Sequence, residues 1–145
     1  MKAIYPGSFN PWHAGHSDVL NKALAVFGQV QITVAINPDK PGEDVWARAE
    51  NIRQLVDKDR VEVRVTHGFL VDYIKDNPDI KAIVRGLRDG KDLENERIQQ
   101  YWNEDLAKEG NIYLPPTVYF LTHRDLVHIS SSAIRTVDKL KKGRK

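Results

Sequence analysis

Short apolar runs alternate along the chain with segments in which apolar residues recur at helical spacing, and this pattern predicts strands alternating with helices. Short β-branched or apolar runs at residues 2–5, 30–36, 61–66, 80–84 and 117–121 are typical of strands. Between them, apolar residues recur at helical spacing, with Val19, Leu20 and Leu24 among them. Helices are predicted at residues 14–27, 43–56, 70–75, 89–107 and 131–140. Pro6-Gly7 is expected to end the first strand.

This alternation predicts an α/β fold. Strands separated by helices form a parallel sheet with right-handed crossovers. We expect a single-domain, Rossmann-like, doubly wound sheet of five parallel strands with helices on both faces. In such sheets, ligands bind at the carboxyl ends of the strands, where the strand order reverses. Functional residues are therefore expected just after the strands.

Composition narrows the class of protein. The 145 residues fit one domain, and 41% hydrophobic with 29% charged residues is typical of a globular chain. The 22 basic and 20 acidic side chains leave a charge of +2, which does not indicate a nucleic-acid partner. No apolar run approaches the roughly 20 residues of a membrane helix. The chain has no cysteine, which excludes a thiolate zinc site and a cysteine nucleophile. We expect a cytoplasmic protein that binds neither membrane nor nucleic acid.

Polar residues follow four of the predicted strands. They are residues 7–16 (GSFNPWHAGH), 37–40, 85–88 (RGLR) and 123–132. Because the carboxyl ends of parallel strands lie at one edge of a sheet, basic and hydroxyl groups from four loops should meet there. The sequence has no GK[ST] phosphate-loop pattern and no evident serine–histidine–acid set.

The first of these segments places His13 and His16 on one face at the start of a helix. A helix N-terminus suits phosphate, and an imidazole N–H donates to phosphate oxygen. Gly7 and Gly15 allow close approach of the backbone. Two solvated histidines at a turn are the alternative; a zinc site has less support, because no third ligand has recognisable spacing.

The serine and arginine segments have similar alternatives. Residues 129–135 (ISSSAIR) offer serines at a helix start, which serve as an anion cradle or simply as a helix cap. Arg85 and Arg88 could grip phosphate bidentately. Alternatively, these arginines form surface ion pairs with Asp89, Asp92 or Glu96.

Together these segments resemble a known group of enzymes. Residues 13–16 (HAGH) resemble the HxGH signature of the nucleotidyltransferase superfamily, and residues 129–135 resemble its second signature. Residues 68–73 (GFLVDY), 83–88 (IVRGLR) and 92–96 (DLENE) resemble the phosphopantetheine adenylyltransferase family. We therefore expect a nucleotidyltransferase domain at residues 1–138 and a basic C-terminal tail at residues 139–145.

The resemblance implies transfer of AMP from ATP to 4′-phosphopantetheine, which gives dephospho-coenzyme A and pyrophosphate in coenzyme A synthesis. The attacking phosphate oxygen is already anionic, so in-line displacement needs no general base. The resemblance implies Mg²⁺ held mainly by the ATP phosphates, with no metal-binding residues. It also allows a homo-oligomer, which is a hexamer in the family.

The resemblance also implies roles for individual residues. Those implied in catalysis are His16, Lys40 and Arg88. Those implied in binding phosphopantetheine are Ser8, Lys40, Val71 and Arg85. Those implied in binding ATP are Ser8, Phe9, His13, His16, Gly86, Leu87, Arg88, Glu96, Leu126, Val127, His128, Ile129, Ser130, Ser131 and Ser132.

Other functions remain open from the sequence. A complete HxGH, as at residues 13–16, is also typical of cytidylyltransferases and of nicotinamide mononucleotide adenylyltransferases, and ISSSAIR resembles the latter. A nucleotide-binding module without activity would keep the fold and lose turnover. A nucleic-acid binder would use the basic tail and bind in a salt-dependent way.

Overall fold

The computed structural model describes residues 1–36 and 44–144. The strands are β1 (Lys2–Gly7), β2 (Gln29–Ala35), β3 (Val61–Thr66), β4 (Ile80–Leu87) and β5 (Thr117–Leu121). The helices are α1 (Ala14–Phe27), α2 (Val45–Leu55), α3 (Leu70–Asp76), α4 (Gly90–Glu109) and α5 (Ser131–Lys142), with a short 3₁₀ helix η1 (Arg124–Leu126) before α5.

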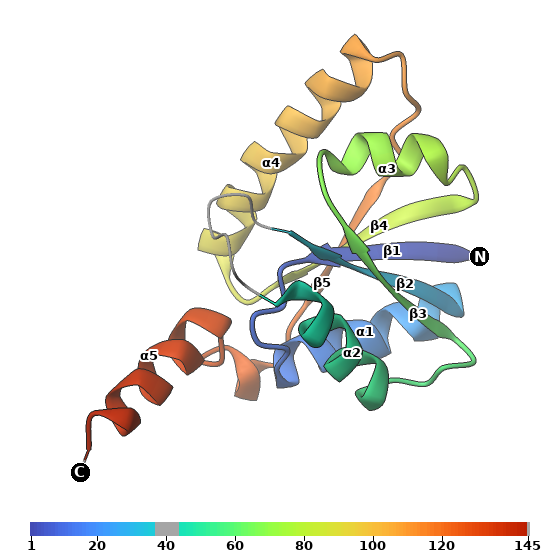
Figure 1. The fold of residues 1–145 in the computed structure, drawn as a ribbon. Coiled ribbons are helices and arrows are strands. Elements are labelled where there is room, and N and C mark those ends of the chain that lie inside the picture. Colours follow the sequence, from blue (N-terminus) through green and yellow to red (C-terminus); the bar gives the residue numbers. More distant parts are fainter. Residues whose placement is uncertain (37–43, 145) are drawn as a thin grey trace.

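Within the described residues, the strands form one five-stranded parallel sheet in the order β3-β2-β1-β4-β5. The chain moves outward from β1 to β3, then returns to the other side of β1 for β4 and β5. Figure 1 shows α1 and α2 below the sheet and α3 and α4 above it. The predicted Rossmann-like, doubly wound fold is confirmed, and its strand order reverses at β1.

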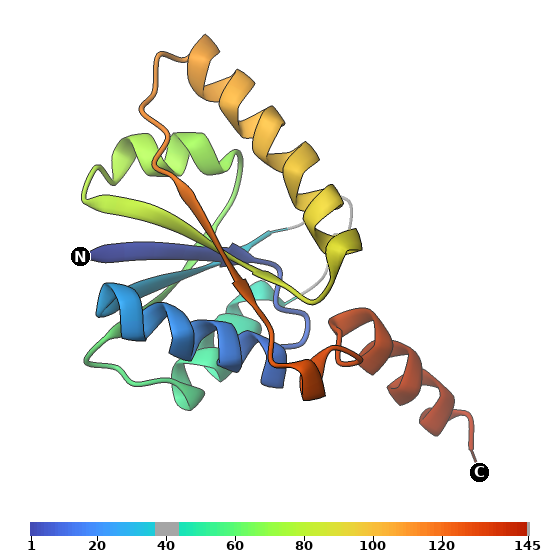
Figure 2. The ribbon, with the colours of Figure 1, turned by 180° about the vertical axis from the view of Figure 1, so that it is seen from behind.

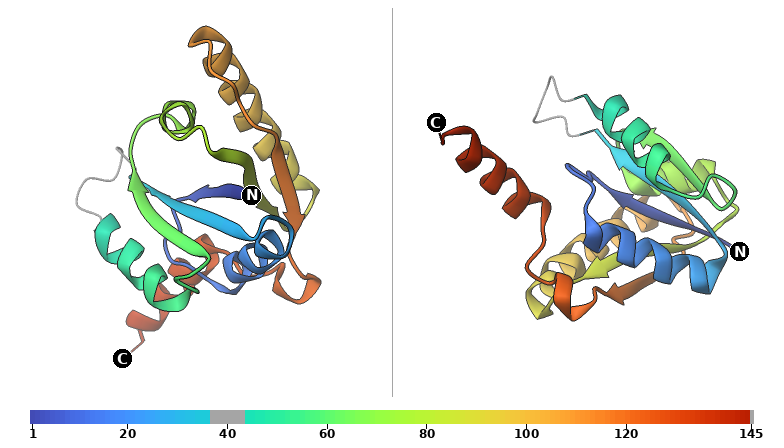
Figure 3. Two further views of the ribbon diagram at one scale, coloured as in Figure 1. Left: turned by 90° about the vertical axis from the view of Figure 1, so that its right-hand side faces the viewer. Right: turned by 90° about the horizontal axis from the view of Figure 1, so that it is seen from below.

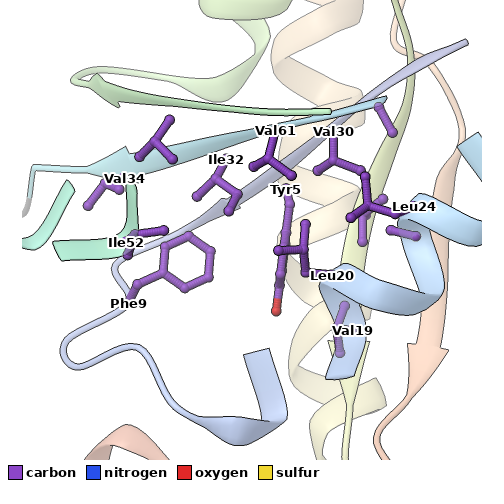
Figure 4. Close-up of a cluster of buried hydrophobic side chains, with 14 of the residues drawn as sticks. Tyr5, Phe9, Val19, Leu20, Leu24, Val30, Ile32, Val34, Ile52 and Val61 are labelled. Atoms are coloured by element: carbon purple, nitrogen blue, oxygen red, sulfur yellow. The ribbon is translucent and has the colours of Figure 1, made fainter. Parts of the chain in front are cut away.

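The larger core lies between the sheet and the helices α1 and α2 (Figure 4). Alternate side chains of β2, such as Ile32, point to this side because strand residues alternate between faces. They pack with Leu20 and Leu24 of α1 and Ile52 of α2, all of them buried. Burying one aliphatic side chain of this size contributes roughly 1.5–3 kcal/mol. This packing fixes where α1 begins, and with it the histidines.

Two strands are longer than predicted. β1 continues through Pro6 to Gly7, in register with Thr33 and Val34 of β2. The Pro6 carbonyl points toward Arg85, and in a strand the backbone N–H of the same residue would point to that side too. Proline lacks this N–H, but pairing with β4 on this side has already ended at Ile4. Proline therefore costs the sheet no hydrogen bond at this position.

The predicted end of the fourth strand at residue 84 is also wrong. β4 continues to Leu87 because β5 pairs alongside it, from Ile83–Thr117 to Leu87–Leu121. Arg85, Gly86 and Leu87 thus lie within the strand, and only Arg88 follows it. The Arg85 side chain points to the α4 side, while Gly86 faces α1, where an added Cβ would lie 2.7 Å from Val19 Cγ2.

Beyond β5 the chain turns through η1 and then enters α5 (Figure 2). α5 extends away from the body of the molecule (Figure 3) and has no buried residue. None of the helices in the described ranges is both long and apolar enough to cross a membrane.

Candidate active site

The carboxyl ends of the strands surround a cavity of about 330 Å³, which we term the polar cavity. Its walls come from the end of β1, the start of α1, the end of β4, the first turns of α4 and the start of α5. The lining residues are Tyr5, Pro6, Gly7, Ser8, Phe9, His13, Gly15, His16, Val19, Arg85, Gly86, Arg88, Asp92, Asn95, Glu96, Thr122, Ile129, Ser130 and Ser131. Residues from three of the four predicted segments, 7–16, 85–88 and 123–132, line this cavity together, and the fourth segment, residues 37–40, lies outside the described residues.

The loop after β1 folds back over the strand. Phe9 has a positive φ of 48°, which is uncommon for a residue with a side chain. Its buried ring packs edge-on against Tyr5 at 5.1 Å between ring centroids. A Cβ at Gly7 would lie 2.9 Å from this ring, so only glycine allows the ring to cover the strand end.

The two histidines form a capping pair at the start of α1. His13 Nδ1 accepts a hydrogen bond from the backbone N–H of Gly15 at 3.1 Å. His16 Nδ1 accepts one from the backbone N–H of His13, also at 3.1 Å. The two rings stack with centroids 3.7 Å apart. With both Nδ1 atoms occupied as acceptors, each ring carries its proton on Nε2.

The electrostatics agree with this assignment. The pKa of His16 is lowered to about 3, mainly by burial and to a smaller extent by the charges of His13 and Arg85. Burial also lowers the pKa of His13, with a contribution from Arg88. Both imidazoles are therefore neutral near pH 7, and each offers one N–H donor.

Arg85 is held by a carboxylate of α4. Its Nε and Nη2 donate to the two oxygens of Glu96 at 2.8 and 2.6 Å, and its Nη1 donates to the Pro6 carbonyl. Arg85 is the more exposed of the pair, at 25% against 15% for Glu96. A phosphate reaching Arg85 must share it with Glu96 or displace that carboxylate.

Arg88 pairs in the same way with Asp92. Nε and Nη2 donate to the two carboxylate oxygens, each at 2.9 Å. This contact holds the pKa of Asp92 below its ordinary value. Asp89 instead caps α4 by accepting from the backbone N–H of Asp92. The ion-pair alternative from the sequence is thus correct for Asp92 and Glu96, and the charges of these two pairs balance.

The serines at the start of α5 serve both as cap and as wall. Ser130 Oγ accepts from the backbone N–H of Ala133 at 3.0 Å, which caps the helix. Ser131 Oγ donates to the Pro11 carbonyl at 2.8 Å, which ties α5 to the loop after β1. Ser132 lies outside the cavity wall, and its Oγ accepts from Arg135.

A second cavity of about 650 Å³ lies on the α3–α4 side of the sheet, and we term it the apolar cavity. It shares Pro6, Gly7, Ser8, Arg85 and Glu96 with the polar cavity, so the two cavities meet at this common wall. Its remaining lining residues are Ala35, Phe69, Leu70, Ile83, Gln99, Gln100, Trp102, Asn103, Leu106, Thr117 and Tyr119.

Most of the residues implied by the resemblance line the polar cavity, and some do not. Those that line it are Ser8, Phe9, His13, His16, Arg85, Gly86, Arg88, Glu96, Ile129, Ser130 and Ser131. Leu126, Val127, His128 and Ser132 lie near the start of α5 but line neither cavity. Leu87 is buried in β4 and Val71 in α3, while Phe69 and Leu70 line the apolar cavity. Lys40 lies outside the described residues.

Several residues at the site were not predicted. Trp102 and Leu106 line the apolar cavity from α4. Arg48 of α2 and Arg135 of α5 donate to backbone carbonyls of the loop after β1. The helical spacing of residues 92, 96, 99, 103 and 106 could have shown that one face of α4 is turned to the site.

No group of three or more histidine, aspartate or glutamate side chains suited to hold a metal ion occurs in the part of the chain that the structure describes. The two carboxylates of the polar cavity, Asp92 and Glu96, are both in ion pairs with arginine. A metal ion brought by a polyphosphate would fit this site only with phosphate and water oxygens as its main ligands.

Comparison with known proteins identifies the family. The sequence profile of the cytidylyltransferase-like family matches residues 4–137. The phosphopantetheine adenylyltransferase of Clostridium novyi is 38% identical over 93% of this chain and 81% of its own length. That of Mycoplasma capricolum subsp. capricolum is 36% identical over 97% of this chain and 98% of its own length.

Two solved structures share the fold. One is the lipopolysaccharide core biosynthesis protein from Thermoplasma volcanium, with a TM-score of 0.53 and 19% identity over 85% of this chain and 98% of that one. The other is NadR protein in complex with NAD and AMP-PNP, with a TM-score of 0.56 and 16% identity over 93% of this chain and 41% of that one. The chain therefore belongs to the cytidylyltransferase-like family of nucleotidyltransferases and, within it, to the phosphopantetheine adenylyltransferases.

Proposed function

We propose that this protein transfers the adenylyl group of ATP to 4′-phosphopantetheine and releases pyrophosphate and dephospho-coenzyme A. The observation that carries the proposal is the wall shared by the two cavities, formed by Pro6, Gly7, Ser8, Arg85 and Glu96. The reaction joins a polyanion to a phosphate with a long, less polar arm. A polar and an apolar cavity that meet at one wall suit this pair of substrates.

In this reaction a phosphate oxygen of the acceptor attacks the α-phosphorus of ATP. A new phosphorus–oxygen bond forms as the bond to the β-phosphate bridging oxygen breaks, and pyrophosphate leaves. The acceptor oxygen is already anionic, so no side chain has to remove a proton. The protein's task is to align two anions and to stabilise charge on the α-phosphate.

The triphosphate is placed in the polar cavity, beside the starts of α1 and α5. Neutral His16 donates its Nε2–H to an α-phosphate oxygen as charge develops there, and the stacked His13 offers a second such donor. The lowered pKa values of both histidines support these roles, because each ring is then neutral near pH 7 and carries its one proton on Nε2. Arg88, fixed by Asp92, adds positive charge at the same wall.

The acceptor phosphate is placed at the shared wall, beside Ser8 and Arg85. Arg85 meets it by sharing or exchanging its contact with Glu96. The pantetheine arm extends into the apolar cavity, between Leu70 of α3 and Trp102 and Leu106 of α4. Val71 lies on the buried side of α3 and supports this part of the site from within the core.

Other parts of the proposal come from the sequence. Lys40, together with Leu87 and residues 126–129 and 132, is proposed to contact the substrates in the bound state. Mg²⁺ would be carried by the ATP phosphates and supplies further charge neutralisation there. A cytoplasmic location, a homo-oligomer and the boundary between a domain at residues 1–138 and a tail at 139–145 stay predictions of the sequence.

The test is release of pyrophosphate from ATP with each acceptor supplied separately. We expect turnover with 4′-phosphopantetheine, little with nicotinamide mononucleotide, and none with ATP alone. Turnover with nicotinamide mononucleotide only would replace the proposed acceptor and keep the nucleotidyltransferase chemistry. CTP supplied in place of ATP tests the cytidylyltransferase alternative in the same assay.

A further inference from the structure

The end of β1 and the loop that follows it are held by three arginines that come from three separate elements. Arg85 of β4 donates to the Pro6 carbonyl, Arg48 of α2 to the Ser8 carbonyl, and Arg135 of α5 to the Asn10 carbonyl. These are three alternate carbonyls of one short segment, residues 6–10. Arg85 also lines both cavities, whereas Arg48 and Arg135 line neither.

We propose that Arg48 and Arg135 are positioning residues, which hold this loop in the shape that presents its backbone N–H groups to the substrate phosphates. This inference rests on the proposed function for its catalytic consequence, but the loop geometry stands without it. Neither arginine needs to touch a substrate in this role.

The loop needs such support because its conformation is costly. A left-handed conformation at Phe9, which is not glycine, costs about 1–2 kcal/mol. The conformation persists only where the surroundings fix it. The sheet does not fix it, because β1 pairs with β4 only as far as Ile4 and with β2 only as far as Gly7. The Phe9 ring anchors one side, and the arginines anchor the carbonyls.

Arg48 has the more direct effect on the site. In a trans peptide, the carbonyl of one residue and the N–H of the next point in opposite directions. Ser8 and Phe9 line the polar cavity, whereas Arg48 does not. By turning the Ser8 carbonyl outward, Arg48 turns the Phe9 N–H toward the cavity, where an anion would lie. Loss of Arg48 frees this peptide to rotate.

Arg135 acts on the other wall of the cavity. Its Nη1 donates to the Asn10 carbonyl, and its Nη2 donates to Ser132 Oγ at 3.2 Å. Ser131 donates to the neighbouring Pro11 carbonyl. Because α5 has no buried residue, these contacts hold its first turn, and hence Ser130 and Ser131, against the loop. Without Arg135, Ser130 and Ser131 can move relative to the loop after β1.

The test compares Arg48→Ala with Arg53→Ala. Arg53 is a matched control, because it lies on the same helix and also donates to a backbone carbonyl, that of Val63 at 2.8 Å. Neither Arg53 nor Val63 lines either cavity. We expect kcat to fall about tenfold or more in Arg48→Ala and to stay unchanged in Arg53→Ala. We expect the KM values for both substrates to change less than kcat. Added guanidinium ion should restore part of the lost rate in Arg48→Ala.

Amide NMR spectra provide a readout that does not depend on turnover. In Arg48→Ala the amide resonances of Ser8 and Phe9 should shift, and in Arg53→Ala they should not. Arg135→Ala should shift those of Ser130 and Ser131 and raise the KM for ATP several-fold, with Lys139→Ala as its control on the same helix. Where Arg48→Ala does not fold, Arg48→Lys keeps the charge without the planar fork and should show the same changes to a smaller degree.

The outcomes separate the two proposals. Unchanged kcat in Arg48→Ala, or unmoved Ser8 and Phe9 amides, would overturn the positioning role. Equal losses in Arg48→Ala and Arg53→Ala would also overturn it, since both would then act through stability alone. A wild-type protein without turnover would defeat the proposed function, while the amide spectra would still decide whether Arg48 shapes the loop.

Discussion

The two cavities differ in what their walls are made of and in how those walls are held. The polar cavity is lined by the starts of helices and by a loop whose side chains cap, stack and pair with one another. The apolar cavity is larger and is lined mainly by side chains of α3, α4 and the sheet. In the proposed reaction, the reacting phosphates need fixed donors, which the densely hydrogen-bonded polar cavity would supply. The pantetheine arm would need only a fitting apolar surface, which the apolar cavity would supply.

The wall shared by the two cavities is the place where the two proposed substrates would meet. Ser8 and Arg85 belong to both cavities and lie where the strand order reverses. Changes on the polar side should therefore act on turnover, and changes on the apolar side should act on binding of the acceptor.

The largest effect is expected from His16→Ala. Removing one preorganised donor at a site of developing charge typically lowers kcat by about 100-fold or more. Binding of ATP should change little, because this interaction strengthens in the transition state. Steady-state kinetics and an ATP titration measure both quantities. The control is His67→Ala, because His67 is exposed and lines neither cavity; equal activity in the two variants would remove His16 from catalysis.

The next effect concerns stability against pH. The pKa of His16 is lowered to about 3 in the folded protein, so between pH 3 and 6.5 the unfolded state binds more protons at this group. Stability therefore falls as the pH falls through this window. From pH 7 to 5, His16 should cost at most about 2 kcal/mol of unfolding free energy.

Urea unfolding of the wild type and of His16→Gln at the two pH values measures this contribution. The glutamine variant should lose less stability on acidification than the wild type. Equal losses in the two proteins would show that His16 is not held neutral in the fold. His16 would then lose its assignment as a neutral ring whose Nδ1 accepts a hydrogen bond from the backbone N–H of His13.

The smallest effect is expected on the apolar side. Trp102→Ala removes an aromatic surface of the apolar cavity and should raise the KM for phosphopantetheine about tenfold, which corresponds to about 1.4 kcal/mol. The KM for ATP should not change. Tyr101→Ala is the matched control, because Tyr101 is the adjacent, exposed residue of α4 and lines neither cavity. A rise in the KM for ATP instead would remove the division between the two cavities.

The fold could be predicted closely from the sequence, because hydrophobic periodicity reports burial directly. The predicted limits of α1, β3 and β5 agree with the structure. The ends of β1 and β4 were wrong for one shared reason. Local residue preferences at Pro6-Gly7 and at Arg85 suggested loops, whereas pairing with β2 and β5 keeps these residues in the sheet.

The site was predicted less completely. Motifs located His13, His16 and the serines, since their spacing at helix starts is local in sequence. The partners of Arg85 and Arg88 stayed open, because ion pairing depends on where α4 packs. Arg48 belongs to none of the motifs, and the signature that ends at Arg135 does not indicate which carbonyl this arginine contacts. A side chain that binds a distant backbone group can be found only once the fold is known.

The most direct test of the shared wall uses dephospho-coenzyme A, the expected product that would span both cavities. Amide and side-chain NMR spectra are recorded as it is added to the labelled protein. We predict saturable shifts both at His16 and Ser131 in the polar cavity and at the Trp102 indole in the apolar cavity. Shifts confined to one cavity, or none at either, would contradict the placement of the two substrates on opposite sides of Ser8 and Arg85.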